Sequence, residues 1–292
     1  MTRGRRSGVG AALILAAGLT AAGPAAQQAI YQKATQTVAV YATVLDRDGH
    51  LVGNLTRRDF QIFDNGRPAD ITVFSNDQQS LMVTLMLDTS YSMQSRLSLV
   101  KESTRRFIDA LQPGDRLRLG TFAEEIAVSP LLTGNKADLL RVLDEEVWPG
   151  GTTPLWAALD EAMASFAGET NRRVVMALTD GISTAGHVDP EVVRSHAIND
   201  SVMIYVVGME GTTLGTTVVQ LADDTGGGHF EVPHGATLAA TFARVADELR
   251  HQYALGFTPV ALDGHLHTID VRLGTPGLSA RARRSYMATA DR

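Results

Sequence analysis

The sequence predicts an α/β protein: an open, mostly parallel sheet flanked by helices, with a small β unit built from the two flanks of the chain. Two observations predict this. Apolar runs of strand length alternate with amphipathic helical patterns through the middle of the 292 residues, as in a sheet whose strands are joined by right-handed crossovers. Segments rich in β-branched residues lie before and after that region, and such segments favour extended structure.

The first residues have the order of a secretory signal. Arg3, Arg5 and Arg6 supply positive charge, residues 9–19 form an apolar run, and small residues follow. This order predicts a signal peptide over 1–26. The apolar run is shorter than the ~20 residues that span a bilayer. We therefore expect a secreted or periplasmic protein with no membrane span after cleavage, and an uncleaved N-terminal membrane anchor is the alternative.

Both flanks of the chain are predicted to form strands. The N-terminal strand segment, 27–80, has extended patterns at 37–44, 60–63 and 71–74, with turns at 46–49 and 64–66. The C-terminal extension, 253–292, has extended patterns at 253–257, 267–273 and 280–286. Because the two segments flank one α/β core, we expect the C-terminal strands to pair with the N-terminal ones.

The middle of the chain, 81–252, alternates between strand and helix patterns. Its predicted strands are 81–87, 117–122, 125–128, 174–178 and 202–207. Its predicted helices are 97–111, 137–147, 155–166, 191–198, 218–223 and 238–249. The run at 81–87 is apolar almost throughout, as expected of a parallel strand that is buried on both faces.

Composition excludes several classes of function. The chain has no cysteine, which rules out disulfides, thiolate metal sites and cysteine nucleophiles. Lys and Arg number 26 against 32 Asp and Glu, so the net charge is −6. Because a nucleic-acid-binding surface is usually basic, we expect no nucleic-acid partner.

Three polar clusters lie at the ends of predicted strands or in a loop that enters a helix. They are Asp88-Thr89-Ser90-Tyr91-Ser92, Gly150-Gly151-Thr152-Thr153-Pro154 and Thr179-Asp180-Gly181. Ligands of an open parallel sheet bind beyond the carboxyl ends of its strands, so the clusters are expected to meet there. Carboxylate and hydroxyl oxygens suit a hard cation such as Mg²⁺.

These clusters resemble the metal-ion-dependent adhesion site of von Willebrand factor type A domains. The matching positions are Asp88-x-Ser90-x-Ser92, Thr153 and Asp180. The resemblance covers residues 81–252 and implies a Rossmann-like fold. Within the family the chain is most similar to a bacterial secreted subgroup, through three stretches outside the site: 55–60, 64–68 and 252–257.

The resemblance also implies a role for each residue. Ser90 and Ser92 would bind Mg²⁺ (or Mn²⁺ or Ca²⁺) directly, and Thr153 directly or through water. Asp88 and Asp180 would mainly hold coordinated waters. Thr153 is preferred to the adjacent Thr152 because its spacing to the following helix fits the family pattern better.

The implied function is metal-dependent protein binding, in which an Asp or Glu carboxylate of a partner protein completes the coordination of the metal. We expect no enzymatic activity. The alternatives are a metal-dependent hydrolase and a structural scaffold with an idle metal site. A nucleophilic Ser90 needs a nearby histidine, and His187 is the only weak candidate.

Several other motifs have simpler interpretations. His265 and His267 share one face of a predicted strand and are expected to be solvated rather than to bind metal. The basic cluster of Arg281, Arg283 and Arg284 is expected at a solvated strand edge. The glycines at 226–228 are expected to form tight turns, because their spacing is not that of a phosphate-binding loop.

Overall fold

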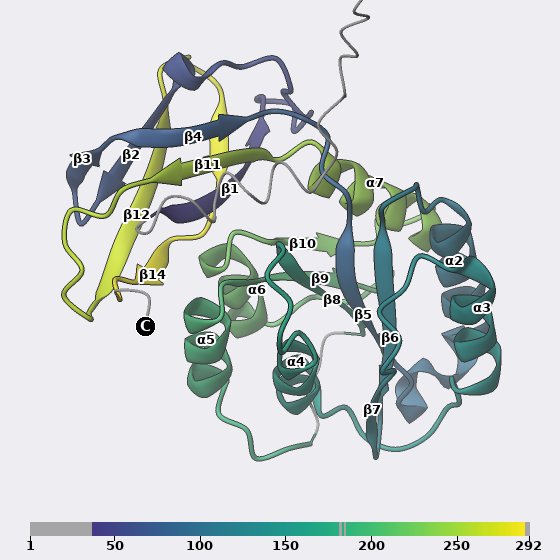
Figure 1. Ribbon diagram of the computed structural model, residues 1–292. Coiled ribbons are helices and arrows are strands. Elements are labelled where there is room, and N and C mark those ends of the chain that lie inside the picture. Colours follow the sequence, from purple (N-terminus) through teal and green to yellow (C-terminus); the bar gives the residue numbers. More distant parts are fainter. Residues whose placement is uncertain (1–36, 181–182, 184, 290–292) are drawn as a thin grey trace, which may run out of the picture.

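The computed structural model describes residues 37–180, 183 and 185–289, so the predicted signal peptide lies outside the described residues. A six-stranded sheet with helices on both faces forms the larger part of the molecule, and two four-stranded sheets lie beside it (Figure 1). Within the described ranges, no helix is both long and apolar enough to cross a membrane.

The six-stranded sheet has the order β10-β9-β8-β5-β6-β7. Its strands are β5 (Met82–Asp88), β6 (Arg116–Phe122), β7 (Ile126–Val128), β8 (Arg173–Thr179), β9 (Val202–Gly208) and β10 (Gly228–Glu231). All neighbours are parallel except β7, which pairs with β6 in the antiparallel sense. The chain thus leaves β5 and β8 at the same edge of the sheet, where the polar clusters lie.

Among the described residues, six α-helices cover the two faces of this sheet. They are α2 (Leu97–Asp109), α3 (Lys136–Glu145), α4 (Leu155–Ala164), α5 (Pro190–Asn199), α6 (Thr216–Asp224) and α7 (Leu238–Arg250). One face packs against α2, α3 and α7, and the other against α4, α5 and α6. Alternate side chains of β5 enter the two cores: Leu85 and Leu87 one of them, Met86 the other. This explains why its sequence is apolar almost throughout.

The two small sheets combine strands from both flanks of the chain. One has the order β13-β1-β11-β4 and the other β14-β12-β2-β3. The N-terminal strands are β1 (Val38–Leu45), β2 (Phe60–Asp64), β3 (Arg67–Ala69) and β4 (Ile71–Ser75). The C-terminal strands are β11 (Tyr253–Phe257), β12 (Leu266–Leu273), β13 (Ser279–Arg281) and β14 (Ser285–Met287). The predicted fold class is therefore confirmed, whereas the predicted domain limits stay a prediction.

A buried polar network joins the small sheets to the α/β core. Glu248 of α7 accepts hydrogen bonds from Tyr205 of β9 at 2.7 Å and from Thr43 of β1 at 3.4 Å. Arg281 of β13 forms an ion pair with the same carboxylate. A carboxylate buried to this degree needs such partners, because an unpaired buried charge is costly.

One strand of the core was not predicted. Residues 228–231 form β10, parallel to β9, whereas the sequence predicted only tight turns at the glycines 226–228 and no strand after them. A Cβ at Gly227 would overlap the carbonyl group of Ile204. Glycine is thus required at position 227, because the chain passes close to the backbone of β9. Comparing the glycine spacing with that of phosphate-binding loops does not reveal this requirement.

The predicted solvation of His267 is wrong. Its side chain is buried, with Nδ1 at 2.7 Å from Asp64 Oδ1. Tyr286 donates a hydrogen bond to the other oxygen of Asp64 at 2.9 Å. His265 is exposed, as expected. Asp64 lies about 200 residues away and Tyr286 lies on another strand, so local sequence gives no sign of these two partners. A third partner, Asp263, is only four residues away, with its Oδ1 at 3.2 Å from His267 Nε2.

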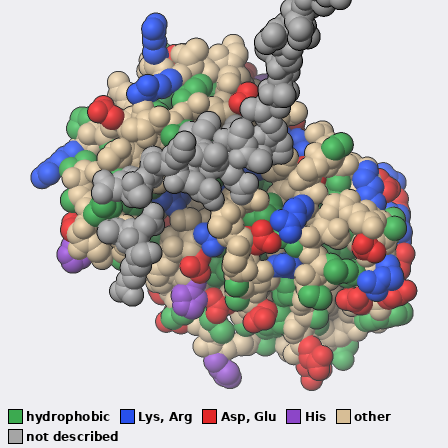
Figure 2. Space-filling view, in the orientation of Figure 1, with side chains coloured by type: hydrophobic (Ala, Val, Ile, Leu, Met, Phe, Trp, Pro, Cys, Tyr) green, Lys and Arg blue, Asp and Glu red, His purple; other side chains and the backbone are tan. Residues whose placement is uncertain are grey.

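The predicted solvated edge of basic residues is also wrong for two of its three members. Arg281 pairs with the buried Glu248, and Arg283 is half-buried. Only Arg284 is mostly exposed. On the face drawn in Figure 2, the described acidic and basic side chains are interspersed, and neither sign gathers into one extended patch. Arg281 and Arg283 are therefore partly enclosed by the fold, and Arg284 alone of the three lies at the surface as predicted.

Candidate metal-binding site

The first polar cluster is a tight turn at the carboxyl end of β5. Asp88, the last residue of the strand, is fully buried. Its Oδ1 accepts a hydrogen bond from the backbone N–H of Ser90 at 3.0 Å, and its Oδ2 accepts one from the Thr179 hydroxyl at 2.7 Å. Because both carboxylate oxygens are held, Asp88 fixes the turn that presents the serines and links it to the end of β8.

The two serine hydroxyls lie side by side. Ser90 Oγ and Ser92 Oγ are 3.0 Å apart, and Ser90 is buried whereas Ser92 is exposed. Adjacent oxygen ligands of octahedral Mg²⁺, at ~2.1 Å from the metal, are about 3 Å apart. The spacing of these hydroxyls therefore fits a divalent cation bound at the mouth of the turn.

Backbone hydrogen bonds attach the second cluster to this turn. Gly150 N–H donates to the Thr89 carbonyl at 2.8 Å, and Tyr91 N–H donates to the Gly151 carbonyl at 3.1 Å. Gly151 has φ of +79°, and a Cβ there would overlap the backbone of Glu124. The glycine thus lets the loop approach both segments, and the loop leads directly into Thr153, which is buried, whereas Thr152 is exposed.

Asp180 follows Thr179 at the carboxyl end of β8 and is half-buried. Burial raises the pKa of Asp88, hydrogen bonds from Ser90 and Thr179 lower it, and the negative charge of Asp180 raises it; the net pKa is raised. Two neighbouring carboxylates at one buried edge repel each other unless positive charge or a proton intervenes. A cation at this edge would supply that charge.

The structure brings three of the five predicted residues into direct contact and places the segments that carry the other two beside them. Asp88, Ser90 and Ser92 are linked by direct hydrogen bonds. The loop that precedes Thr153 is hydrogen-bonded to the turn of the serines. Asp180 directly follows Thr179, whose hydroxyl is hydrogen-bonded to Asp88. Thr179 itself was not among the predicted site residues, although its hydroxyl orients Asp88. Its position as the last residue of a parallel strand beside β5 is the signal that identifies it.

A histidine base is not seen beside Ser90 within the described ranges. His187 is exposed and forms no described hydrogen bond with Ser90. The described residues at this edge offer oxygen ligands: the hydroxyl groups of Ser90, Ser92, Thr153 and Thr179 and the carboxylates of Asp88 and Asp180.

A second group of possible ligands lies elsewhere, on the turn after β1. Single ligand atoms of Asp46, Asp48 and His50 all lie within 4.8 Å of one another. Asp46 Oδ1 accepts hydrogen bonds from the backbone N–H groups of both other residues at 2.9 Å, as in an ordinary aspartate-stabilised turn. The group is largely exposed, and its geometry is explained by the turn alone.

Comparisons with known proteins identify the family and the fold of the chain. The profile of the von Willebrand factor type A domain matches residues 83–244. No curated protein matches the chain. Among solved structures, a von Willebrand factor type A protein from Catenulispora acidiphila has a TM-score of 0.53 at 13% identity, covering 89% of this chain and 76% of the other.

Mussel byssus proteins show a likeness of the same degree. Proximal thread matrix protein 1 has a TM-score of 0.51 at 22% identity, over 62% of this chain and 49% of its own. The same protein with a zinc-occupied metal-ion-dependent adhesion site has a TM-score of 0.51 at 23% identity, over 62% and 48%. The chain thus spans about half the length of the mussel protein, and at these identities the likeness concerns the fold.

Proposed function

The chain belongs to the von Willebrand factor type A domain family, and from that premise we propose that it is a secreted or periplasmic module that binds a partner protein through a divalent cation. Domains of this family are typically metal-dependent protein-interaction modules. The observation that carries the proposal is the turn of Asp88, Ser90 and Ser92, with two hydroxyl oxygens 3.0 Å apart above a carboxylate that is itself held by hydrogen bonds.

The roles of the residues follow from their contacts. Ser90 and Ser92 would supply hydroxyl oxygens, and Thr153 a third, directly or through water. Asp88 and Asp180 would hold coordinated waters, since both Asp88 oxygens already accept hydrogen bonds from protein groups. A cation held directly by uncharged oxygens keeps most of its positive charge and attracts an external carboxylate. We favour Mg²⁺, with Mn²⁺ or Ca²⁺ as substitutes.

The exposure of Ser92 supports access by a partner. An Asp or Glu side chain approaching the turn would meet the open side of the site rather than the core beneath it. The positive n-region, apolar run and small residues of the N-terminus support export from the cytoplasm. The partner of this module would then be an extracytoplasmic protein.

Thermal unfolding with and without metal tests the site. Mg²⁺ or Mn²⁺ at a hundredfold excess over Kd should raise the Tm by roughly 5–10 °C, because a ligand that binds only the folded state stabilises it. Asp88→Ala should abolish the rise. Ser92→Ala should weaken it and, because Ser92 is exposed, leave the metal-free Tm nearly unchanged.

Asp46→Ala is the matched control, since it removes the other group of possible ligands. It should keep the full metal response. Equal stabilisation of the wild type and both site variants, or loss of the response in Asp46→Ala alone, contradicts the proposed site.

The partner is tested by affinity capture from the native extracytoplasmic fraction. Wild-type protein should retain a partner in Mg²⁺ and release it to a chelator, and Asp88→Ala should retain none. Methylation of carboxyl groups in that fraction should abolish capture. Capture that is unchanged by chelation would favour a scaffold role with an idle metal site.

A further inference from the structure

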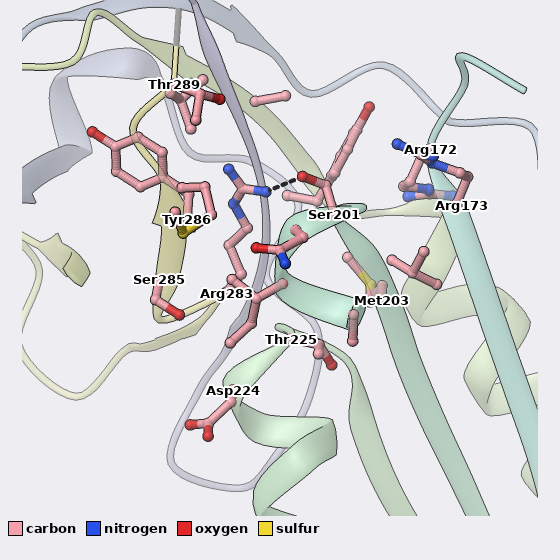
Figure 3. Close-up of a pocket in the computed structure, with 18 of the residues that line it drawn as sticks. Arg172, Arg173, Ser201, Met203, Asp224, Thr225, Arg283, Ser285, Tyr286 and Thr289 are labelled. Carbon is pink, nitrogen blue, oxygen red and sulfur yellow. Dashed lines mark hydrogen bonds between the residues drawn. The ribbon is translucent and has the colours of Figure 1, made fainter. Parts of the chain in front are cut away.

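A cavity of about 470 Å³ lies where the small sheets meet the α/β core (Figure 3). Its walls include the amino ends of two core strands, at Arg173 of β8 and Ser201 before β9. The proposed metal site lies at the opposite end of β8, at Thr179, about 20 Å away along the strand. The cavity is therefore a separate site, of a volume usual for small-molecule binding.

Three arginines line this cavity, and their described hydrogen bonds and ion pairs include no carboxylate, although the negative charge of Asp115 also acts on Arg172. Arg283 Nη1 donates to Ser201 Oγ at 2.7 Å, and Figure 3 shows its guanidinium between Tyr286 and Ser201. Arg172 Nη1 donates to the Leu249 carbonyl and to Gln252 Oε1, both neutral acceptors. Arg173 lies beside Arg172 on the other side of the cavity.

The one acidic residue in the lining is already paired elsewhere. Asp224 accepts from Arg194 at 2.8 Å and from Arg284 at 3.4 Å, and neither of these arginines lines the cavity. The cavity therefore carries an excess of positive charge in a chain whose net charge is −6. Such local excess in a concave site attracts anions.

Several residues of this lining carry buried polar atoms that have no described partner. Six buried side-chain polar atoms within the described residues have no protein partner. Three of them belong to residues that line this cavity: Arg172 Nη2, Arg283 Nε and Ser285 Oγ. Because these three atoms have almost no exposed surface, they mark a region where the chain is short of hydrogen-bond acceptors, rather than donors that already face the cavity.

The electrostatic environment is consistent with this assignment. Burial lowers the pKa of Arg283 to about 10, against the opposing influence of Tyr286 and Tyr41, so the side chain stays charged at neutral pH. Burial also lowers the pKa of Arg172. Burial raises the pKa of Tyr41, which keeps its phenol protonated and able to donate.

We propose that this cavity binds a small organic oxyanion, a carboxylate or a phosphate ester, with Arg283 and Arg172 holding the anionic group. Guanidinium groups match such oxygens in geometry and charge. Val38, Met203 and Leu262 and the rings of Tyr41 and Tyr286 provide an apolar wall for the organic body. The space exceeds what an inorganic ion alone would fill.

Isothermal titration calorimetry on the full chain at low salt tests the proposal with three probes of similar shape. Benzoate and phenyl phosphate carry the two candidate anionic groups, and benzamide is the neutral control. At least one anion should bind in a 1:1 ratio, and benzamide at least about tenfold more weakly. The anion that binds more tightly shows whether the cavity prefers a carboxylate or a phosphate ester. Failure of both anions to bind, or equal binding of benzamide, overturns the proposal.

Variants assign the binding to the cavity. Arg283→Gln should weaken anion binding about tenfold or more, while Arg272→Gln, an exposed arginine of β12, should leave it unchanged. Tyr41→Phe removes only a hydroxyl and keeps the ring, so it tests the site if Arg283→Gln fails to fold, and it should weaken binding severalfold. Ser92→Ala should have no effect. Anion binding that persists unchanged in both Arg283→Gln and Tyr41→Phe overturns the assignment.

Discussion

The interior of the small sheets contains a buried acid whose partners come from distant parts of the chain. Asp64 is fully buried at the end of β2. It accepts hydrogen bonds from the Val260 N–H at 2.8 Å and the Tyr286 hydroxyl at 2.9 Å, and it contacts His267. With these partners, one carboxylate fixes β2, β12, β14 and the loop after β11 relative to one another.

This cluster makes the stability depend on pH through His267. Burial lowers the pKa of His267, but hydrogen bonds and charge from Asp64 and Asp263 outweigh it, and the net pKa is raised. A raised folded-state pKa contributes stability that is complete below the unfolded value, near 6.5, and is lost as pH rises through the folded value. Urea unfolding from pH ~5.5 to ~9 should show this loss, and His267→Gln should remove its share.

His265→Gln is the matched control, because His265 is exposed two residues away. It should keep the wild-type pH dependence. Asp160 raises the pKa of His196, so His196 also makes the free energy of unfolding fall with rising pH. Because this contribution is the same in every variant, the difference between the variants comes from His267. Identical pH profiles for wild type and His267→Gln would refute the assignment.

Helix α7 is the element that ties the sheet of the core to the small sheets. Its apolar stripe packs against α2 and the central strands, with Phe242 and Phe107 in edge contact at 5.7 Å. Its last turn carries Glu248 and Arg250, both buried. Arg250 forms a two-pronged ion pair with Asp115, at 3.0 and 2.6 Å, and Asp115 also accepts from the backbone N–H of Leu81.

Removing the cation of this pair should destabilise the protein strongly. Arg250→Met keeps the length of the side chain but leaves the buried Asp115 uncompensated, which should lower the free energy of unfolding by about 3–5 kcal/mol. Arg105→Met, which breaks the exposed pair with Asp144, should cost less than about 1 kcal/mol. Urea unfolding measures both. Similar losses in the two variants would show that α7 is not held by this pair.

At the scale of the whole molecule, the core and the small sheets share buried contacts. The Glu248 network spans β1, β9, β13 and α7. A backbone bridge pairs Thr225 with Arg283. Because these contacts lie in the interior, loss of one unit exposes polar groups of the other, and the two are expected to unfold together.

Cooperativity can be measured because both tryptophans belong to the α/β unit: Trp156 is half-buried in α4, whereas Trp148 is 67% exposed. The change in tryptophan fluorescence on unfolding therefore reports mainly the surroundings of Trp156 in the α/β unit, and far-ultraviolet circular dichroism reports the whole fold. The two midpoints should coincide in wild-type protein, and Glu248→Ala should lower both. The exposed Glu191→Ala should leave them unchanged. Two separate midpoints in the wild type would contradict a single cooperative unit.

The sequence predicted what depends on local pattern. Periodicity located the α/β alternation, because buried parallel strands are apolar throughout and helices carry an apolar stripe. The turn chemistry of Asn65 and Gly66 was sufficient to place a hairpin, and both have positive φ. The order of oxygen-bearing residues at strand ends identified Asp88, Ser90 and Ser92, which the structure brings into direct contact.

Only the tertiary structure decided the features that depend on distant partners. Strand β10 has only four residues, so its strand pattern is too short to be recognised beside the preceding glycines. Its position in the sheet depends on the close approach of Gly227 to β9. Burial of His267 and Arg283 follows from the meeting of the two flanks, which no local window contains. Burial of these side chains is tolerated because Asp64 accepts a hydrogen bond from His267, and Ser201 accepts one of the hydrogen bonds that Arg283 can donate. The periodicity of apolar residues shows which face of a helix or strand is buried. The partner of a buried charge depends on which distant segments pack together in the folded chain, and the local sequence does not contain that information.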